Sequence, residues 1–540
     1  MYTQRQHNKV RSLHSDRFFR SSLSYIIFVV GTALVIIAWL ESYPISTPPL
    51  GKHLIDDVSP LFWPGLSLIL VSLALIARSK SKRTRFLCAI TFVFFLYFHY
   101  FLFQLLPGPD AHSFRALTKL YSTVGPDPTE QSYFQWPSFF VLGNVLVNVL
   151  GIGVDSVSVV VFLATGFLLS STLFFFFSVE DERLDFTSVS LYFTGLFWFL
   201  NYQFAPQSLA LGLFFLLVNF ASKRSAAVEI ASLVVFISLV LMHAFIPALF
   251  LLYYLILTVR DPRRMNLLLS FSAIYAIMLA YFAVHFGWQL LGILLGFYSL
   301  GGEYAGILQG TFRGPVAFLD DIAQFFSRGI TLFIWSILLV GFLGKIIKRE
   351  ITINNLSLLL TGLIHFLGGV VLSILGSRGL QVLFVPFVSG YRFFVDRSAK
   401  IMYICILLIF LLFPFVVLHQ IYDTTSAQTA SGERASEMLI RTLDTRLSGV
   451  DILSNDRDGD YVFKMLPSSR QIWIETSFTV SKERMLTHRY DYIFYGPMLE
   501  KEALYNYNLD NAQVMAFRLH FISKCNKLYD DGYTSVLSYY

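Results

Sequence analysis

Asp110 and His112 are the residues whose types and spacing best support acid–base chemistry. They stand in the stretch PGPDAHSFRAL, directly after a long apolar run. A carboxylate that is partly withdrawn from water has a raised proton affinity and can act as a general base. His112, or the pair Asp127 and Glu130, can help to bind a divalent cation such as Mg²⁺ or Mn²⁺, although the residues alone leave the need for a metal open. The alternative for Asp110 is structural, because an aspartate before Ala111 is also an ordinary N-cap of a helix.

Arg378, in LGSRGLQVLF, is the main candidate for binding a phosphate. A guanidinium group can hold a phosphate by two parallel hydrogen bonds, and Gln381, three residues later, is a neighbouring polar side chain that can pair with this arginine. The alternative is that the Arg378 side chain extends to anionic lipid head groups. Tyr304, Glu303 and Arg313 are weaker candidates of the same kind.

Three more residues that can line a substrate groove stand where apolar runs begin or end. They are Trp136 in YFQWPSFF, Gln207 in NYQFAPQSLALGLFF, and His243 in LMHAFIP. Each has a structural alternative. Trp136 can anchor the chain at a membrane interface, Gln207 can occupy the half-exposed first turn of a helix that begins with proline, and His243 can be a hydrogen-bonded residue at the end of a span.

The elements that position these residues follow from composition. Of 540 residues, 55% are hydrophobic, 17% are aromatic and only 14% are charged, and the mean hydropathy is +0.61. A soluble domain has roughly 25% charged residues because its surface faces water. The composition therefore excludes a soluble enzyme, a disordered regulator and a nucleic-acid-binding domain, and it predicts a protein of the cell membrane that contacts membrane lipids.

Apolar stretches long enough to cross a bilayer, or nearly so, predict an all-α polytopic bundle of about 13 transmembrane helices. The stretches are residues 23–40, 61–77, 86–106, 157–178, 187–202, 205–221, 226–242, 245–259, 266–285, 328–344, 355–375, 380–394 and 401–420. We expect residues 137–153, which contain two asparagines and three glycines, to form an interfacial helix within an outer loop, 107–156. A second outer loop is expected over residues 286–327.

The orientation follows from the basic residues of the short loops, which stay preferentially in the cytoplasm. If the N-terminus is cytoplasmic and the spans alternate, most of these residues fall inside, and few fall outside. The outer ones are Lys52, Arg115, Lys119, Arg313, Arg328 and Arg378. The net charge of +6 is thus explained by membrane orientation, without nucleic acid.

After residue 420 the composition changes, and residues 421–540 contain no apolar run of span length. Runs typical of strands occur at YVFKML, QIWIET, YDYIFYG and TSVLSYY, and they alternate with helix-like stretches at 432–447 and 509–527. We therefore expect a small extracytoplasmic α/β C-terminal domain.

These features together resemble the C-type glycosyltransferase superfamily of polytopic membrane enzymes that use lipid-linked sugars. The resemblance rests on Asp110 in PGPDAHSF, the stretch QWPSFFVLGNVLVNVLG that ends at Gly151, and FAPQSLALGLFF with the later His243-x-x-Ile-Pro247. It covers a core over residues 86–420, with residues 1–85 adding a cytoplasmic tail and two extra helices. The resemblance implies transfer of a sugar from a polyprenyl-phosphate donor to an acceptor on the outer face, with Asp110 as the catalytic base or as a metal ligand.

Two other functions are weighed against this one. A transporter or flippase for lipid-linked substrates usually contains two related halves and ionisable residues near the bilayer centre, and the sequence has neither feature. A non-catalytic membrane scaffold that displays the C-terminal domain is the other alternative, because Asp110 can serve solely as the N-cap of a helix, without a catalytic role. The sugar, the acceptor and the oligomeric state are not encoded in any motif that we identify.

Overall fold

The computed structural model describes a helical bundle and a small sheet. The described residues are 2–43, 58–78, 81–102, 111–125, 132–182, 184–197, 204–223, 225–281, 283, 318–372 and 376–417, with shorter C-terminal segments at 435–436, 438–440, 450–454, 472–476, 484–485, 488–495, 499, 513, 516, 519–521, 525–530 and 535–539. For some of them, including Arg378, only the backbone is described.

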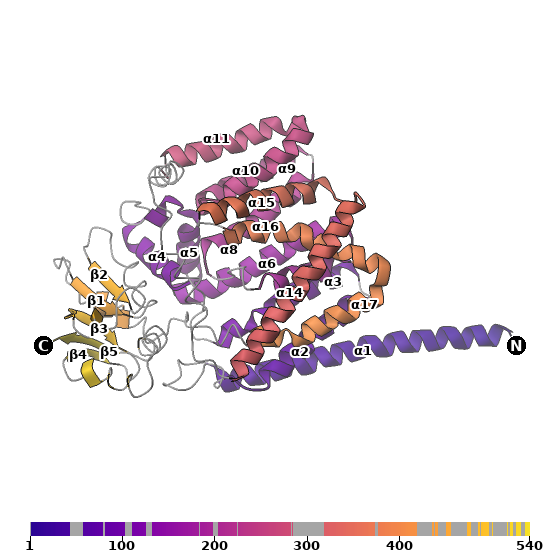
Figure 1. Ribbon diagram of the computed structural model, residues 1–540, viewed down its shortest axis with the longest axis horizontal. Coiled ribbons are helices and arrows are strands. Elements are labelled where there is room, and N and C mark those ends of the chain that lie inside the picture. The colour runs from indigo at the N-terminus through magenta and orange to yellow at the C-terminus, as the bar shows by residue number, and fades with distance from the viewer. Residues whose placement is uncertain are drawn as a thin grey trace.

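Each of the predicted spans corresponds to a helix of the bundle (Figure 1). These helices are α1 (Tyr2–Ser42), α2 (Phe62–Ala77), α3 (Lys82–Leu96), α6 (Val154–Glu180), α7 (Asp185–Gly195), α8 (Pro206–Ala221), α9 (Ala226–Met242), α10 (Ile246–Arg260), α11 (Met265–Tyr281), α14 (Phe318–Ile347), α15 (Ile353–Leu372), α16 (Gly376–Ser389) and α17 (Tyr391–Leu412). Two further helices, α4 (Ala111–Val124) and α5 (Ser138–Leu150), lie between α3 and α6.

Five segments of the described chain are long and apolar enough to cross a membrane. They are Ser22–Ser42, Val154–Glu180, Pro262–Tyr281, Gly329–Ile347 and Lys400–Val417. Their outer faces carry large apolar side chains that are exposed, such as Val29, Leu332 and Ile347. A soluble protein rarely exposes so many on adjacent helices, whereas lipid chains cover them favourably. The fold is therefore that of a helical protein with the surface of a membrane-embedded bundle.

Contacts between helices show which helix ends lie together. Asn355, near the start of α15, donates from Nδ2 to Ser389 Oγ at the end of α16 (3.2 Å) and to the Glu180 carboxylate at the end of α6. Arg264, just after α10, donates to the carbonyl oxygen of Ala221 at the end of α8. We call this side of the bundle, where α6, α8, α10 and α16 end, the charged end. The first residues of the same four helices lie at the opposite side, the α4 end.

Local sequence explains where several helices begin and end. Ser225 caps α9, because its Oγ accepts a hydrogen bond from the Val228 N–H (3.3 Å). Pro206 occupies the first position of α8, where its missing N–H costs nothing. Helix α5 ends at Gly151, whose φ of 65° is left-handed and favours glycine.

Several span boundaries differ from those predicted. Helices α1, α14 and α17 begin earlier than the predicted stretches 23–40, 328–344 and 401–420, and α3 ends at Leu96, within the predicted stretch 86–106. The predicted outer loop 286–327 is therefore wrong at its end, because residues 318–327 are helical. The predicted stretch 380–394 is divided in the structure, since α16 ends at Ser389 and α17 begins at Tyr391. At this break Gly390 and Gly341 let two backbones approach, and a Cβ on either one would collide with backbone atoms of the other helix. Helix α7 has 11 residues, or about 16 Å of rise, so it alone is too short to cross a hydrocarbon core of about 30 Å.

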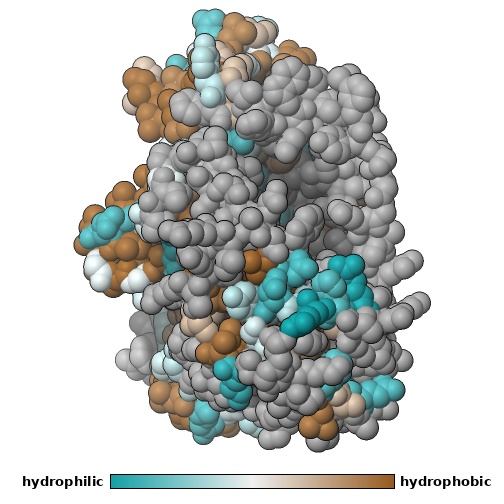
Figure 2. Space-filling model, turned by 90° about the vertical axis from the view of Figure 1, so that its left-hand side faces the viewer, coloured by the Kyte–Doolittle hydropathy of each residue, from teal (hydrophilic) through white to brown (hydrophobic). Residues whose placement is uncertain are grey.

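The C-terminal segments form a mixed five-stranded sheet beside the α4 end (Figure 1). Its strands are β1 (Val450–Ser454), β2 (Ile472–Thr476), β3 (Tyr492–Tyr495), β4 (Cys525–Asp530) and β5 (Ser535–Tyr539), in the order β2-β1-β3-β5-β4. Strand β1 pairs in parallel with β2 and β3, whereas β5 pairs antiparallel with β3 and β4. Figure 2 looks onto this end and shows hydrophilic residues gathered in its lower part, at the height of the sheet.

The sheet has its own apolar core, which includes Leu439, Ile452 and Phe494. The predicted strands in QIWIET, YDYIFYG and TSVLSYY are confirmed as β2, β3 and β5. YVFKML lies outside the described residues. Strand β1 was not predicted, and the predicted helix-like stretch 509–527 is wrong at its end, because β4 begins at Cys525.

Candidate functional site

Helix α4 carries the first predicted site residues at the α4 end. It begins at Ala111, as the capping alternative for Asp110 requires. Asp110 itself lies outside the described residues. His112 is the second residue of α4 and is buried, and its Nε2 lies 3.2 Å from Ser113 Oγ. The first turn of α4 therefore holds His112 away from open solvent.

Arg115, one turn further along α4, is the largest side chain that the structure buries completely. It is 1% exposed, and its Nε lies 3.6 Å from Oδ1 of Asp155, which is 46% exposed in the first turn of α6. A buried cation is costly unless charges or hydrogen bonds compensate it. The sequence analysis placed Arg115 only as an outer-loop cation and did not predict its burial.

Helix α5 packs on α4 through the small and amide residues that make it a poor span. Asn144 Nδ2 donates to the Thr118 carbonyl (3.3 Å) and to the Phe140 carbonyl (3.0 Å). A Cβ on Gly143 would come within 2.9 Å of Thr118 Cγ2, so glycine permits the close approach. The asparagine and glycine thus have a packing role between α4 and α5.

Aromatic contacts connect the segments that carry Trp136 and Gln207 to α4. The ring centroids of Phe114 in α4 and Phe139 in α5 are 6.0 Å apart, and those of Phe139 and Phe204 are 4.9 Å apart. Trp136 is half-buried in the turn before α5, and Gln207 is half-buried as the second residue of α8. One continuous set of rings therefore positions both residues at the α4 end.

His243 occupies the turn between α9 and α10. Its Nδ1 accepts hydrogen bonds from the backbone N–H groups of Phe245 (3.1 Å) and Ile246 (3.4 Å). These are donors at the beginning of α10 that lack partners within the helix. The structural alternative for His243 is thus realised, and the same contacts fix its ring at the α4 end.

Arg378 is the third residue of α16, so its backbone also lies at the α4 end. Tyr304, Glu303, Arg313, Asp127 and Glu130 lie outside the described residues. The structure therefore places His112, Trp136, Gln207, His243 and the Arg378 backbone at one end of the bundle, each in or next to the first turn of a helix.

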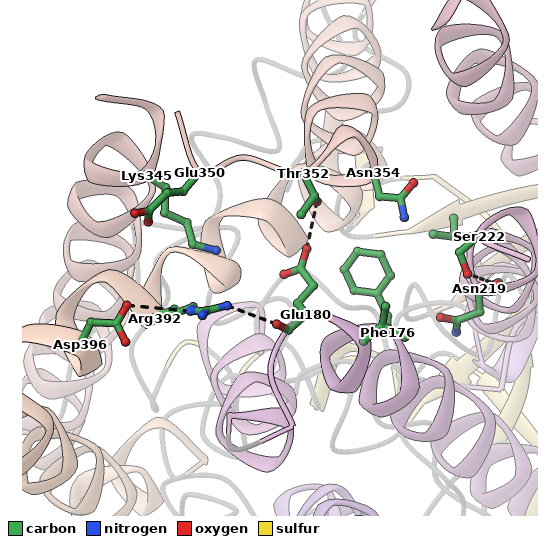
Figure 3. Close-up of a pocket in the computed structure, with 12 residues that line it drawn as sticks. Phe176, Glu180, Asn219, Ser222, Lys345, Glu350, Thr352, Asn354, Arg392 and Asp396 are labelled. Carbon is green, nitrogen blue, oxygen red and sulfur yellow. Dashed lines mark hydrogen bonds and ion pairs between the residues drawn. The ribbon is translucent and has the colours of Figure 1, made fainter. Parts of the chain in front are cut away.

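A pocket at the charged end was not predicted from the sequence. It has a volume of about 340 Å³ and lies between the ends of α6, α8 and α14 and the beginnings of α15 and α17 (Figure 3). Its polar wall comprises Glu180, Asn219, Ser222, Lys345, Glu350, Thr352, Asn354, Arg392 and Asp396. From the sequence, the basic loops were used for orientation alone, and the acidic stretch VEDERLD, residues 179–185, was assigned no site. Their opposite charges within the same group of loops were the available signal.

Ion pairs and hydrogen bonds fix the floor of this pocket. Glu180 accepts from Thr352 Oγ1 (3.1 Å) and from Asn355 Nδ2, and its backbone carbonyl accepts from Arg392 Nη1 (3.2 Å). Arg392 Nε also lies 3.6 Å from Asp181 Oδ2 and 3.9 Å from Asp396 Oδ2. Figure 3 shows Glu180 and Arg392 side by side at the centre of the site.

No family model matches this chain, and no curated protein matches it significantly. Among the described residues, no three His, Cys, Asp or Glu side chains lie close enough together to hold a metal ion.

Proposed function

We propose that this chain is an integral membrane glycosyltransferase that transfers a sugar from a polyprenyl-phosphate donor to an acceptor on the outer face of the membrane. The observation that carries the proposal is the gathering of His112, Gln207, His243 and the Arg378 backbone at the first turns of helices at one end of the bundle. Helix N-termini favour anions, and so does the guanidinium group of arginine. An end of this kind suits a lipid-phosphate substrate.

The proposal includes a membrane orientation. The thirteen helices that match the predicted spans cross the membrane or are packed within it, with the charged end in the cytoplasm and the α4 end outside. The basic residues at the charged end, such as Arg85, Arg264 and Lys345, support this orientation. The sheet beside the α4 end then lies outside, close to the acceptor side of the reaction.

The proposed reaction is a displacement at the anomeric carbon of the donor sugar. Asp110, which directly precedes α4, takes the proton of the acceptor hydroxyl as its oxygen bonds to that carbon. The bond from the carbon to the phosphate oxygen breaks, and its electron pair leaves with the polyprenyl phosphate. Arg378 stabilises the negative charge of the departing phosphate. No nucleotide is consumed at this step, since the donor is already activated.

Asp110→Asn is the direct test of the base. In membranes that contain the native acceptors, release of polyprenyl phosphate from a short-chain polyprenyl-phosphate hexose should fall by about 10²–10⁴-fold, because general base catalysis contributes that much. Asp57→Asn, in the predicted outer segment between the first two spans, is the matched control and should keep activity. A folded Asp110→Asn protein that turns the donor over at the normal rate would contradict the assignment.

Arg378→Ala tests the phosphate contact separately. This substitution should raise the KM for the donor far more than Arg313→Ala does, because Arg313 belongs to the predicted outer loop 286–327 and not to the segment that carries Arg378. Equal effects of the two substitutions on the KM for the donor would contradict the proposed contact of Arg378 with the donor phosphate. The orientation is tested by protease added to intact cells, which should degrade a tag placed after Tyr540; a protected tag would contradict an external sheet.

A further inference from the structure

Lys345 gives the pocket at the charged end its specific chemistry. This lysine, in the last turn of α14, is only 6% exposed, yet it lines the pocket. In the described part of the chain its Nζ donates no hydrogen bond and forms no ion pair within 4.0 Å. Figure 3 shows the ammonium pointing into the space beside Arg392 and Glu180. Because Arg392 is already held by two carboxylates and a carbonyl, Lys345 is the cation that is best placed to receive an anionic ligand.

An acidic group lies next to this lysine on the same wall. The Glu350 N–H donates to the Lys345 carbonyl (3.0 Å), and the intervening Arg349 has a left-handed φ of 58°. This conformation is costly for a residue with a side chain. It turns the chain back sharply, so that Glu350 lines the pocket beside Lys345. A ligand whose negative group contacts Lys345 therefore also has the carboxylate of Glu350 beside it in the pocket.

The rim of the pocket is apolar and exposed. Val179, which lines the pocket together with the buried Phe176 and Val218, is 76% exposed. Water-soluble ligands do not require such a rim, whereas acyl chains cover it favourably. The pocket thus combines a polar interior of head-group size with apolar side chains at its edge.

We propose that this pocket binds the head group of a zwitterionic phospholipid that carries a primary ammonium, of the phosphoethanolamine type. The phosphate contacts Lys345, the ammonium donates to Glu350, and the acyl chains run over Val179 at the edge of the pocket. The pocket offers both signs of charge, because Lys345 and Arg392 line it together with Glu180, Glu350 and Asp396. The acidic partner makes this pocket selective for a zwitterion over a purely anionic lipid. This inference is independent of the proposed sugar transfer.

Lipid binding to the full chain, purified in detergent, tests the proposal by native mass spectrometry. Dioleoyl phosphatidylethanolamine should bind about tenfold more tightly than dioleoyl phosphatidylcholine, whose quaternary ammonium has no N–H to donate. Lys345→Met should weaken phosphatidylethanolamine binding about tenfold. Lys223→Met is the matched control, because Lys223 lines a separate pocket at the same end, and this variant should bind as the unmodified protein does.

Glu350→Gln provides a second, independent measurement at a more exposed position. It should bring the preference for phosphatidylethanolamine over phosphatidylcholine close to one, even if Lys345→Met fails to fold. Soluble glycerophosphoethanolamine should compete poorly with phosphatidylethanolamine for the pocket, because it lacks acyl chains. If it competes as well as the lipid does, the pocket recognises the free head group, and the proposal of a lipid ligand is wrong. Equal binding of phosphatidylethanolamine, phosphatidylcholine and phosphatidylglycerol, or normal binding by a folded Lys345→Met protein, would overturn the proposal.

Discussion

The ion pair between Arg85 and Asp185 allows a quantitative prediction about stability. Asp185, the first residue of α7, is completely buried. Arg85 of α3 donates to it from Nε (2.8 Å to Oδ1) and from Nη2 (3.1 Å to Oδ2). Two further donors reach the same carboxylate, Ser178 Oγ of α6 (3.2 Å) and the backbone N–H of Phe186 (2.7 Å). This single carboxylate therefore joins three helices.

Arg85→Met removes the charge but keeps an apolar stem of similar length. Asp185 then remains buried with its two weaker donors and without its cation. Removing one partner of a buried pair costs about 3–5 kcal/mol, and the two remaining hydrogen bonds place the expected loss near the lower limit, about 3 kcal/mol. We expect Asp185→Asn to cost less, because it removes the buried charge together with the attraction.

The matched control is Lys82→Met, one turn earlier on the same helix. Lys82 Nζ lies 3.6 Å from Glu182 Oε1, and both side chains are largely exposed, so its loss should cost less than about 1 kcal/mol. The assay is reversible unfolding in mixed micelles with increasing sodium dodecyl sulfate, followed by tryptophan fluorescence. If Arg85→Met and Lys82→Met shift the free energy of unfolding equally, the reasoning from burial is refuted.

Two other stability predictions use the same assay. Gly362→Ala should destabilise the contact of α15 with α16 by about 1–3 kcal/mol, because a Cβ there would lie 2.5 Å from Leu383 N, which is backbone and cannot turn away. Gly329→Ala in α14 meets open space and should be neutral or stabilise by up to about 1 kcal/mol; equal losses at the two glycines would contradict the packing. Ser225→Ala should cost about 1 kcal/mol through loss of the α9 cap, and no loss would mean that the cap does not contribute.

Hydropathy predicts the helices well because a span is a local property of about 20 residues. The break at Gly390 could not be predicted in this way, since it depends on Gly341, which is 49 positions away in the chain and belongs to another helix. Strand β1 was missed for a similar reason. Its five residues are recognisable as a strand only through pairing with β2 and β3.

The site was predictable where a residue's role is set by its neighbours in the sequence. His243 before a proline-containing helix start was predicted as a hydrogen-bonded residue of a turn, and it accepts two backbone hydrogen bonds there. The pocket around Lys345 was not predictable, because its walls come from five helices. Arg115 shows the same limit, since nothing in its local sequence distinguishes a buried arginine from a loop cation.

The short acidic loop after α6 has a consequence for how the protein is made. Asp185 is paired with Arg85, which the ribosome has already synthesised, whereas Asp181 and Glu180 bind Arg392 from a segment synthesised more than two hundred residues later. During translation the ion pair between Arg85 and Asp185 can form early. The ion pair between Asp181 and Arg392 cannot form until Arg392 of α17 has been synthesised. In the proposed orientation, the cytoplasmic side of the nascent chain thus carries the Asp181 carboxylate without its arginine while more than two hundred residues are added.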